Sequence, residues 1–203
     1  MCDVKIEKEY NKKYGDIPKN DTDRILLLLS NIKNPKKYFG EIFKSIEEIK
    51  NIKWLRHDFT IYLLPKATPR PRYNNSSHIF YVKGAKDNRD LFYKFIDSCG
   101  IDVIKTPCKF TCISYLPIPF SMNIIERILA ELGFIRPITK PDWDNLGKTY
   151  SDMIQGSLLF DDALIVEGTS KKFYSIKPRI EISIEYMERY DSIYNENKIR
   201  KKV

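Results

Sequence analysis

Hydrophobic positions in the first quarter of the chain recur at helical spacing. Asp21 or Thr22 can cap a short helix that carries isoleucines and leucines. A second apolar series begins after Pro35, a residue suited to the first turn of a helix. Its members recur at steps of three and four, and they are Tyr38, Phe39, Ile42, Phe43, Ile46 and Ile49. We interpret residues 1–56 as an N-terminal helical extension, whose apolar face covers either the main domain or a partner.

From Asp58 onward the pattern changes to short apolar runs and strict alternation, which are typical of strands. Four segments have this pattern: 59–64, 110–116, 164–174 and 179–186. Three helical segments lie between them, at about 87–100, 122–132 and 145–155. The chain therefore predicts an α+β fold over residues 57–187, with a small mixed β-sheet and helices packed on one face. Residues 188–203 form a charged tail with a basic end.

Composition narrows the function classes. The 203 residues are 42% hydrophobic, enough to bury a core, and no apolar run approaches the length that spans a bilayer. The N-terminus is polar and lacks the apolar core of a signal peptide, so we expect a cytoplasmic protein with no membrane association. A formal net charge of +8 favours a polyanionic partner such as nucleic acid.

The cysteines do not have the spacing of a zinc site. None of the four forms a CxxC pair, and both histidines lie far in sequence from Cys108 and Cys112. Because Cys108 and Cys112 alternate with Phe110 on an expected strand, we predict that both are reduced and buried on one face.

The segment 140–148 carries the strongest chemical signal. Pro141 disfavours helix at the residue before it, so we expect an extended chain in which Asp142 and Asp144 point to the same side. Asp144 is also well placed to cap a helix that begins at Asn145. On that helix Asp144, Lys148 and Asp152 fall on one stripe at steps of four.

Two more carboxylates, Asp161 and Asp162, precede the next expected strand. Convergent carboxylates repel one another, and a hard divalent cation is the natural compensating charge. Mg²⁺, or Mn²⁺ in its place, could polarise a phosphoryl oxygen and activate water. Lys148 could then stabilise the charge that develops on the phosphate. The pattern favours a metal-dependent enzyme acting on phosphate esters.

Other interpretations of these acids stay open. A capping Asp preceded by a turn Asp would explain the pair Asp142 and Asp144 without any metal, in a non-catalytic basic DNA-binding module. The same pair resembles the DxD of nucleotide-sugar transferases, but the strand–helix alternation of a nucleotide-binding half is missing. A D…(D/E)xK nuclease is disfavoured because the only ExK, at Glu196, lies in the tail.

A stiff basic loop follows the first expected strand and contains Pro69 and Pro71. Prolines lower the entropy that such a loop loses when it grips phosphate, and contacts of this kind position DNA without selecting its sequence. The expected DNA-binding residues are Lys66, Arg70, Arg72, Lys83 and Lys86. We interpret Trp143 as a packing residue, with stacking on an unpaired base as the alternative.

At these residues the sequence resembles the RusA family of Holliday junction resolvases. The resemblance rests on KPDxDNxxK, an Asp four residues after the Lys, a Gly and a DD pair before a strand, with a PRPR-type segment upstream. It covers about Asp58 to Tyr186 and implies a RusA-like fold and a Mg²⁺-dependent endonuclease that works on branched DNA as a homodimer. By this resemblance Asp142, Asp144 and Asp162 bind metal and Lys148 is catalytic. Asp161 is a further candidate ligand, and Asp152 and Asn145 are supporting residues.

Overall fold

The structure is a computed structural model that describes residues 18, 20–68, 72–73, 79–80 and 86–190, with the backbone alone at 72–73, 79–80 and 86–89. Two compact units divide the chain, residues 1–51 and residues 52–203. The expected basic tail lies outside the described residues from position 191 onward. Within the described ranges, no helix has both the length and the apolar character needed to cross a membrane.

The described part of the N-terminal unit includes the helices α2 (Asp21–Leu29) and α3 (Lys36–Lys50). Asn20 caps α2, because its side-chain oxygen accepts a hydrogen bond from the Asp23 backbone N–H at 2.9 Å. The predicted caps Asp21 and Thr22 instead lie inside the first turn. Along α3 no residue is fully buried. What its apolar stripe covers therefore stays a prediction.

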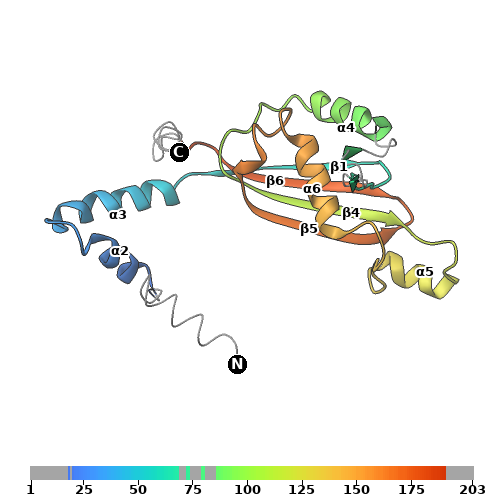
Figure 1. Cartoon of the computed structure of the whole chain (residues 1–203), viewed down its shortest axis with the longest axis horizontal. Helices are drawn as coiled ribbons and strands as arrows, with labels where there is room; N and C mark the ends of the chain where they lie inside the picture. The colour runs from blue at the N-terminus through green and yellow to red at the C-terminus, as the bar shows by residue number, and fades with distance from the viewer. Residues whose placement is uncertain (1–17, 19, 69–71, 74–78, 81–85, 191–203) are drawn as a thin grey trace. The chain divides into compact units, whose positions relative to one another are not determined.

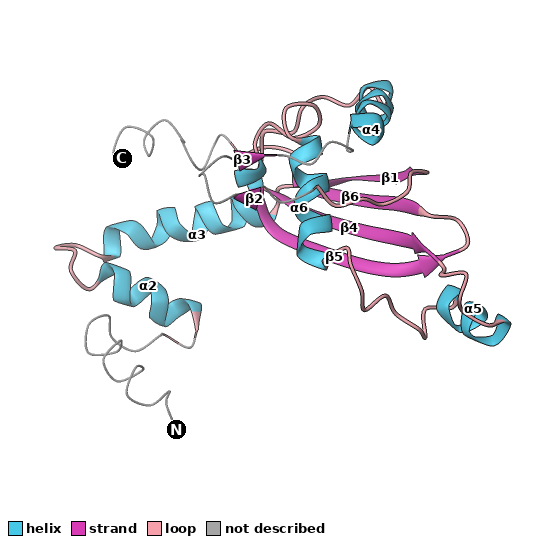
Figure 2. Ribbon diagram, turned by 45° about the vertical axis from the view of Figure 1, so that its right-hand side comes forward, coloured by secondary structure: helices cyan, strands magenta, loops and turns pink. Residues whose placement is uncertain are grey.

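A four-stranded mixed sheet forms the centre of the second unit (Figures 1 and 2). Its strands are β1 (Trp54–Ile61), β4 (Cys108–Pro117), β5 (Ile165–Ser175) and β6 (Arg179–Met187). They lie in the order β1-β6-β4-β5. The pairs β1–β6 and β6–β4 are antiparallel, whereas β4–β5 is parallel. The α+β fold with a small mixed sheet is thus confirmed.

Strand β1 begins earlier than its sequence pattern predicted. The predicted strand covered residues 59–64, whereas β1 pairs with β6 from Trp54 onward, opposite Met187. Charged side chains at Arg56 and Asp58 masked the start, because this part of the strand has only one buried face. The strand therefore begins before the expected domain boundary at residue 57.

Helices cover one face of the sheet. Helix α6 (Trp143–Ile154) lies across the strands, as Figure 2 shows. It also contacts α4 (Lys86–Ser98). The largest side chains that are fully buried in this layer include Phe92 of α4, Leu146 and Ile154 of α6, and Ile180, Ile182 and Ile184 of β6. Helix α5 (Ile124–Glu131) follows β4, and the short strands β2 (Arg72–Tyr73) and β3 (Ile79–Phe80) pair with each other in the basic loop.

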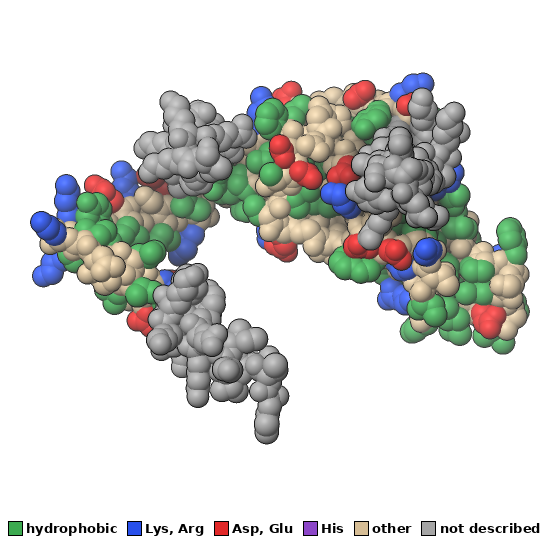
Figure 3. All heavy atoms as spheres, viewed as in Figure 1, with side chains coloured by type: hydrophobic (Ala, Val, Ile, Leu, Met, Phe, Trp, Pro, Cys, Tyr) green, Lys and Arg blue, Asp and Glu red, His purple; other side chains and the backbone are tan. Residues whose placement is uncertain are grey.

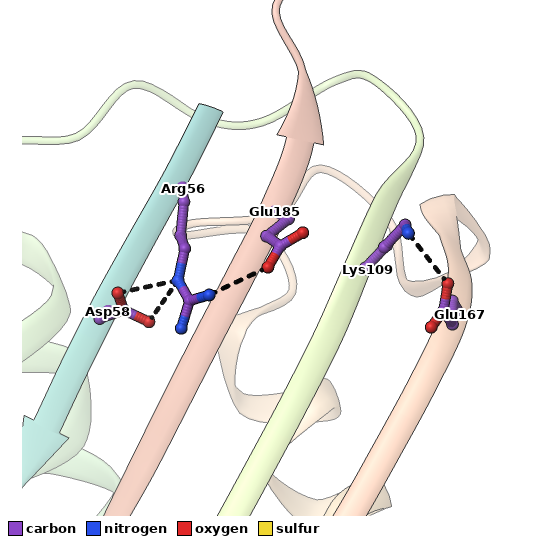
Figure 4. A network of polar contacts seen from close by, with 5 residues as sticks. All are labelled: Arg56, Asp58, Lys109, Glu167 and Glu185. Carbon is purple, nitrogen blue, oxygen red and sulfur yellow. Dashed lines mark hydrogen bonds and ion pairs between the residues drawn. The ribbon is translucent and has the colours of Figure 1, made fainter. Parts of the chain in front are cut away.

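The opposite face of the sheet is polar (Figure 4). Arg56 on β1 bonds to Asp58 at 2.9 Å and to Glu185 on β6 at 3.1 Å. Lys109 on β4 pairs with Glu167 on β5 at 3.2 Å. The hydrogen bond from Arg56 lowers the pKa of the Asp58 carboxyl. The charged residues named here are therefore paired with one another. Buried and less buried residues alternate along most of β6, which confirms the alternation predicted for the last strand.

The sheet core also holds two free thiols, as predicted. Cys108 and Cys112 are fully buried on the helix-covered face. Burial disfavours the thiolate, which raises the pKa of Cys108 to about 11 and that of Cys112 to about 12.

These two thiols predict a loss of stability at alkaline pH. In the unfolded chain they ionise near their ordinary value of 9.0, whereas the folded protein keeps them protonated. The unfolded state therefore binds fewer protons above that pH, and the free energy of unfolding falls as pH rises from about 9 to 12. Urea denaturation at pH 8, 9 and 10 measures the slope. The free energy of unfolding should fall less steeply with pH in Cys112→Ala than in the wild type. Equal slopes in the two proteins would show that the Cys112 thiol does not cause the pH dependence.

Candidate active site

The acidic segment forms the start of helix α6. The helix begins at Trp143, and Asp142 occupies the N-cap position with extended backbone angles (φ −68°, ψ 142°). Asp144 lies in the first turn. The prediction that Asp144 caps the helix was therefore wrong, because the helix starts two residues earlier than expected. The side chain of Asp142 makes no capping hydrogen bond.

This early start changes how the two carboxylates are related. The expectation that they point to the same side required an extended chain through Asp144, whereas that residue is helical. Asp142 is extended and Asp144 is helical, so the argument from an extended chain does not decide which way these two side chains point. Among the described residues, no three Asp, Glu, His or Cys side chains gather closely enough to hold one metal ion. The ligand set Asp142, Asp144 and Asp162 stays a prediction.

The predicted stripe on α6 includes an observed ion pair. The Nζ atom of Lys148 lies 3.8 Å from Oδ1 of Asp152, one turn further along the helix. Both side chains are well exposed, at 71% for Lys148 and 44% for Asp152. Such exposed pairs contribute only about 0–1 kcal/mol, so little energy holds the ammonium in this contact. Lys148 can therefore leave this contact for another anion at low cost.

The second acidic pair lies directly before β5. Asp161 caps the short 3₁₀ helix η1 (Asp162–Leu164), and its Oδ1 accepts a hydrogen bond from the Ala163 backbone N–H at 2.9 Å. Asp162 is half-buried in the first turn of η1. Asp161 therefore already has a structural role, which makes Asp162 the more suitable ligand of the two. Carboxylate oxygens of this kind are the donors that Mg²⁺ prefers.

A groove of about 240 Å³ lies between α6 and the strands β4 and β5. From α6 it is lined by Trp143, Asp144 and Lys148, and from β5 by Thr169 and Ser170. One wall therefore carries a carboxylate and an ammonium group, and the other carries hydroxyls. Trp143 is 60% exposed at this groove, so it is not the packing residue that we predicted.

Helix α6 approaches β5 closely at this groove. A Cβ atom added at Gly147 would lie 2.9 Å from Cβ of Ser170, which is too close for two carbons. The Ser170 hydroxyl donates a 2.7 Å hydrogen bond to the Trp143 carbonyl oxygen. Gly147 and Ser170 together fix the first turn of α6, and with it Asp144, against the strand.

The other side of α6 holds the base of the basic loop. Asn145 donates from Nδ2 to the Thr68 carbonyl at 3.1 Å, and Thr149 accepts from the Thr68 N–H at 2.8 Å. The Tyr150 hydroxyl accepts from the Lys66 N–H at 3.1 Å. Neither Thr149 nor Tyr150 was predicted from the sequence to anchor the loop. A buried Tyr usually finds a partner for its hydroxyl, and that was the available signal.

The expected DNA-binding residues are only partly described. Lys66 is exposed at the start of the loop. For Arg72 and Lys86 the structure gives the backbone alone, in β2 and α4, and Arg70 and Lys83 lie outside the described residues. The anchoring hydrogen bonds nevertheless join this loop to the helix that carries Asp144 and Lys148.

Comparison with known proteins agrees with this architecture. The family model described as endodeoxyribonuclease RusA matches residues 63–185, which include β4, α6, η1 and the whole basic loop. The chain is also similar to a Bacillus subtilis (strain 168) protein named "Uncharacterized protein YqaN". The two are 29% identical over 133 residues, which cover 62% of this chain and 93% of that relative.

Proposed function

Because the chain belongs to the RusA endodeoxyribonuclease family, we propose that it is a divalent-metal-dependent enzyme that hydrolyses phosphodiester bonds at Holliday junctions or related branched DNA. The observation that carries the proposal is the groove beside α6, where Asp144 and Lys148 share one wall. A carboxylate and a mobile ammonium beside each other suit a metal-assisted attack on a phosphate.

The metal would be held by Asp142, Asp144 and Asp162. Their oxygens fit Mg²⁺, which commonly takes one or two carboxylates and fills its remaining positions with water and substrate phosphate. When bound, the ion would polarise a phosphoryl oxygen and lower the pKa of a water. The exposed start of α6 leaves room for the phosphate to join this set.

Lys148 and Asp152 would act on the phosphate side of the groove. The ammonium of Lys148 would move from its 3.8 Å contact with Asp152 to the phosphate, where it stabilises negative charge. Asp152 would orient the ammonium while no substrate is bound. The basic loop would bind neighbouring phosphates through Lys66, Arg70, Arg72, Lys83 and Lys86, and a homodimer would place two such sites on a four-way junction.

Loosening the base of the loop should weaken DNA binding. In Asn145→Ala the Thr68 carbonyl loses its side-chain donor, so the loop must be ordered at the moment of binding. We expect junction affinity to fall about 3–10-fold, since about 0.5–1.5 kcal/mol is typical of one hydrogen bond. Fluorescence anisotropy with labelled junction measures the affinity. Ser98→Ala removes a comparable bond within α4 as the control, and equal affinities in all three proteins would contradict the anchoring role.

A comparison of substrates tests the proposed function. Labelled four-way junction, flap, linear duplex and single strand are incubated with the full-length protein in Mg²⁺ or in chelator. We expect paired cuts in the junction, weaker cutting of the flap, little cutting of duplex or single strand, and none with chelator. A protein that binds the junction but never cuts it would instead be a DNA-binding module.

A further inference from the structure

Helix α5 is amphipathic in the reverse sense to a normal surface helix, because its apolar side faces solvent. Five of its apolar positions are 37–69% exposed, and they are Ile124, Ile125, Ile128, Leu129 and Leu132 at its C-cap. At about 100° per residue they form one continuous arc of about 140°. The side toward the rest of the unit is instead small and polar, with Ala130 fully buried.

The helix is held firmly in this orientation. The carboxylate of Glu131 accepts hydrogen bonds from the Ser175 hydroxyl at 3.2 Å and from the Ile176 backbone N–H at 2.6 Å. At the other end, Asn123 and Glu126 form a reciprocal capping box. The exposed arc is therefore a built feature of the fold and cannot turn inward without breaking these contacts.

The arc is large enough to form an interface. Figure 3 shows hydrophobic side chains gathered over α5. Phe134, just after the helix, adds a ring that is 76% exposed. Together with the arc it exposes on the order of 700 Å² of apolar surface, close to the ~800 Å² that each partner contributes to a stable interface. Exposed apolar patches larger than a few hundred Å² mark interaction sites on soluble proteins.

We infer that this α5 surface, made of the arc and Phe134, is where two copies of the chain associate. The inference rests on the proposed function, in which a homodimer would place two sites on one junction. Each chain carries a net charge of +8, so two copies can approach most closely where the contact surface itself is uncharged. The arc carries no charge, and a surface of this kind can pair with itself about a two-fold axis.

Other partners fit this surface less well. DNA binding needs cations, and none lies within the arc. Membrane-surface helices place several Lys or Arg residues along their polar side, whereas α5 (Ile124–Glu131) has Arg127 as its one basic residue.

Mass measurement of the full-length protein without DNA tests the inference. Sedimentation equilibrium should give a dimer for the wild type and at least a tenfold larger dissociation constant for Ile128→Asp. Leu28→Asp, at an exposed leucine of α2, is the matched control and should remain dimeric. A monomeric wild type would overturn the inference, as would dissociation by Leu28→Asp but not by Ile128→Asp.

A second variant guards against misfolding of Ile128→Asp. Ile128→Cys keeps a small apolar side chain, and a short bis-maleimide linker should join more copies of this variant than of the wild type, whose own cysteines set the background. No added cross-linking would contradict the inference. Cleavage is measured separately, because a dimer that never cuts DNA refutes the proposed function alone, whereas a monomer that cuts junctions refutes the interface alone.

Discussion

Replacing Asp144 with Asn should reduce junction cleavage by on the order of 10³-fold while leaving junction binding intact. The amide keeps the shape of the side chain but removes the negative charge that would hold the metal. Because a carboxylate near the groove repels DNA phosphates, the neutral variant should bind at least as tightly as the wild type. Single-turnover cleavage in Mg²⁺ gives the rate, and anisotropy in Ca²⁺ or chelator gives the affinity.

Asp97→Asn supplies the control for this prediction. It makes the same chemical change at an exposed position of α4, outside the residues that line the groove. Its cleavage rate should equal that of the wild type. If Asp144→Asn also cut at the wild-type rate, the role assigned to Asp144 would be refuted.

A methyl group added at Gly147 should displace the first turn of α6 and lower the cleavage rate. In Gly147→Ala the new Cβ would lie 2.9 Å from Cβ of Ser170, an atom fixed to the backbone of β5. The first turn of α6 must then move away from the strand and carry Asp144 with it. Overpacking of this kind costs about 1–3 kcal/mol, against a gain of about 1 kcal/mol for Ala over Gly within a helix. We expect a large drop in cleavage rate, with a smaller change in stability.

Removing the Ser170 side chain provides the test of this mechanism. The double variant Gly147→Ala/Ser170→Gly should lose less free energy of unfolding, measured in urea, than the two single variants lose together. The difference should be about 1–3 kcal/mol. Gly40→Ala in α3, where nothing lies within 4 Å, should leave cleavage unchanged. Strictly additive single changes would show that the contact does not limit the position of α6.

The fold could be predicted largely because its core pattern is local. Alternation along Arg179–Met187 and helical steps along Trp143–Ile154 each repeat over enough residues to be unambiguous. The start of β1 was missed because only one face of that strand is buried, so its charged residues resembled the preceding helix. Strand order was out of reach, since no residue pattern indicates that β6 lies between β1 and β4.

The sequence supplied candidate site residues, which stay predictions, but not the local geometry around them. Lys148 and Asp152 lie one helical turn apart, as predicted, because their spacing of four residues sets this relation in any α-helix. The extended chain expected through Asp144 was wrong, because the helix begins two residues earlier than predicted. The anchoring of the basic loop by Thr149 and Tyr150 depends on contacts about 80 residues apart in sequence, which no local pattern contains.

The central claim is that one divalent ion is bound by Asp142, Asp144 and Asp162, with Lys148 beside it. Anomalous diffraction from crystals grown with Mn²⁺ and an uncleavable junction locates the ion directly. We expect a peak within about 2.5 Å of oxygens from these carboxylates and from a DNA phosphate. A strong peak elsewhere, or Mn²⁺ bound without any of the three, would contradict it.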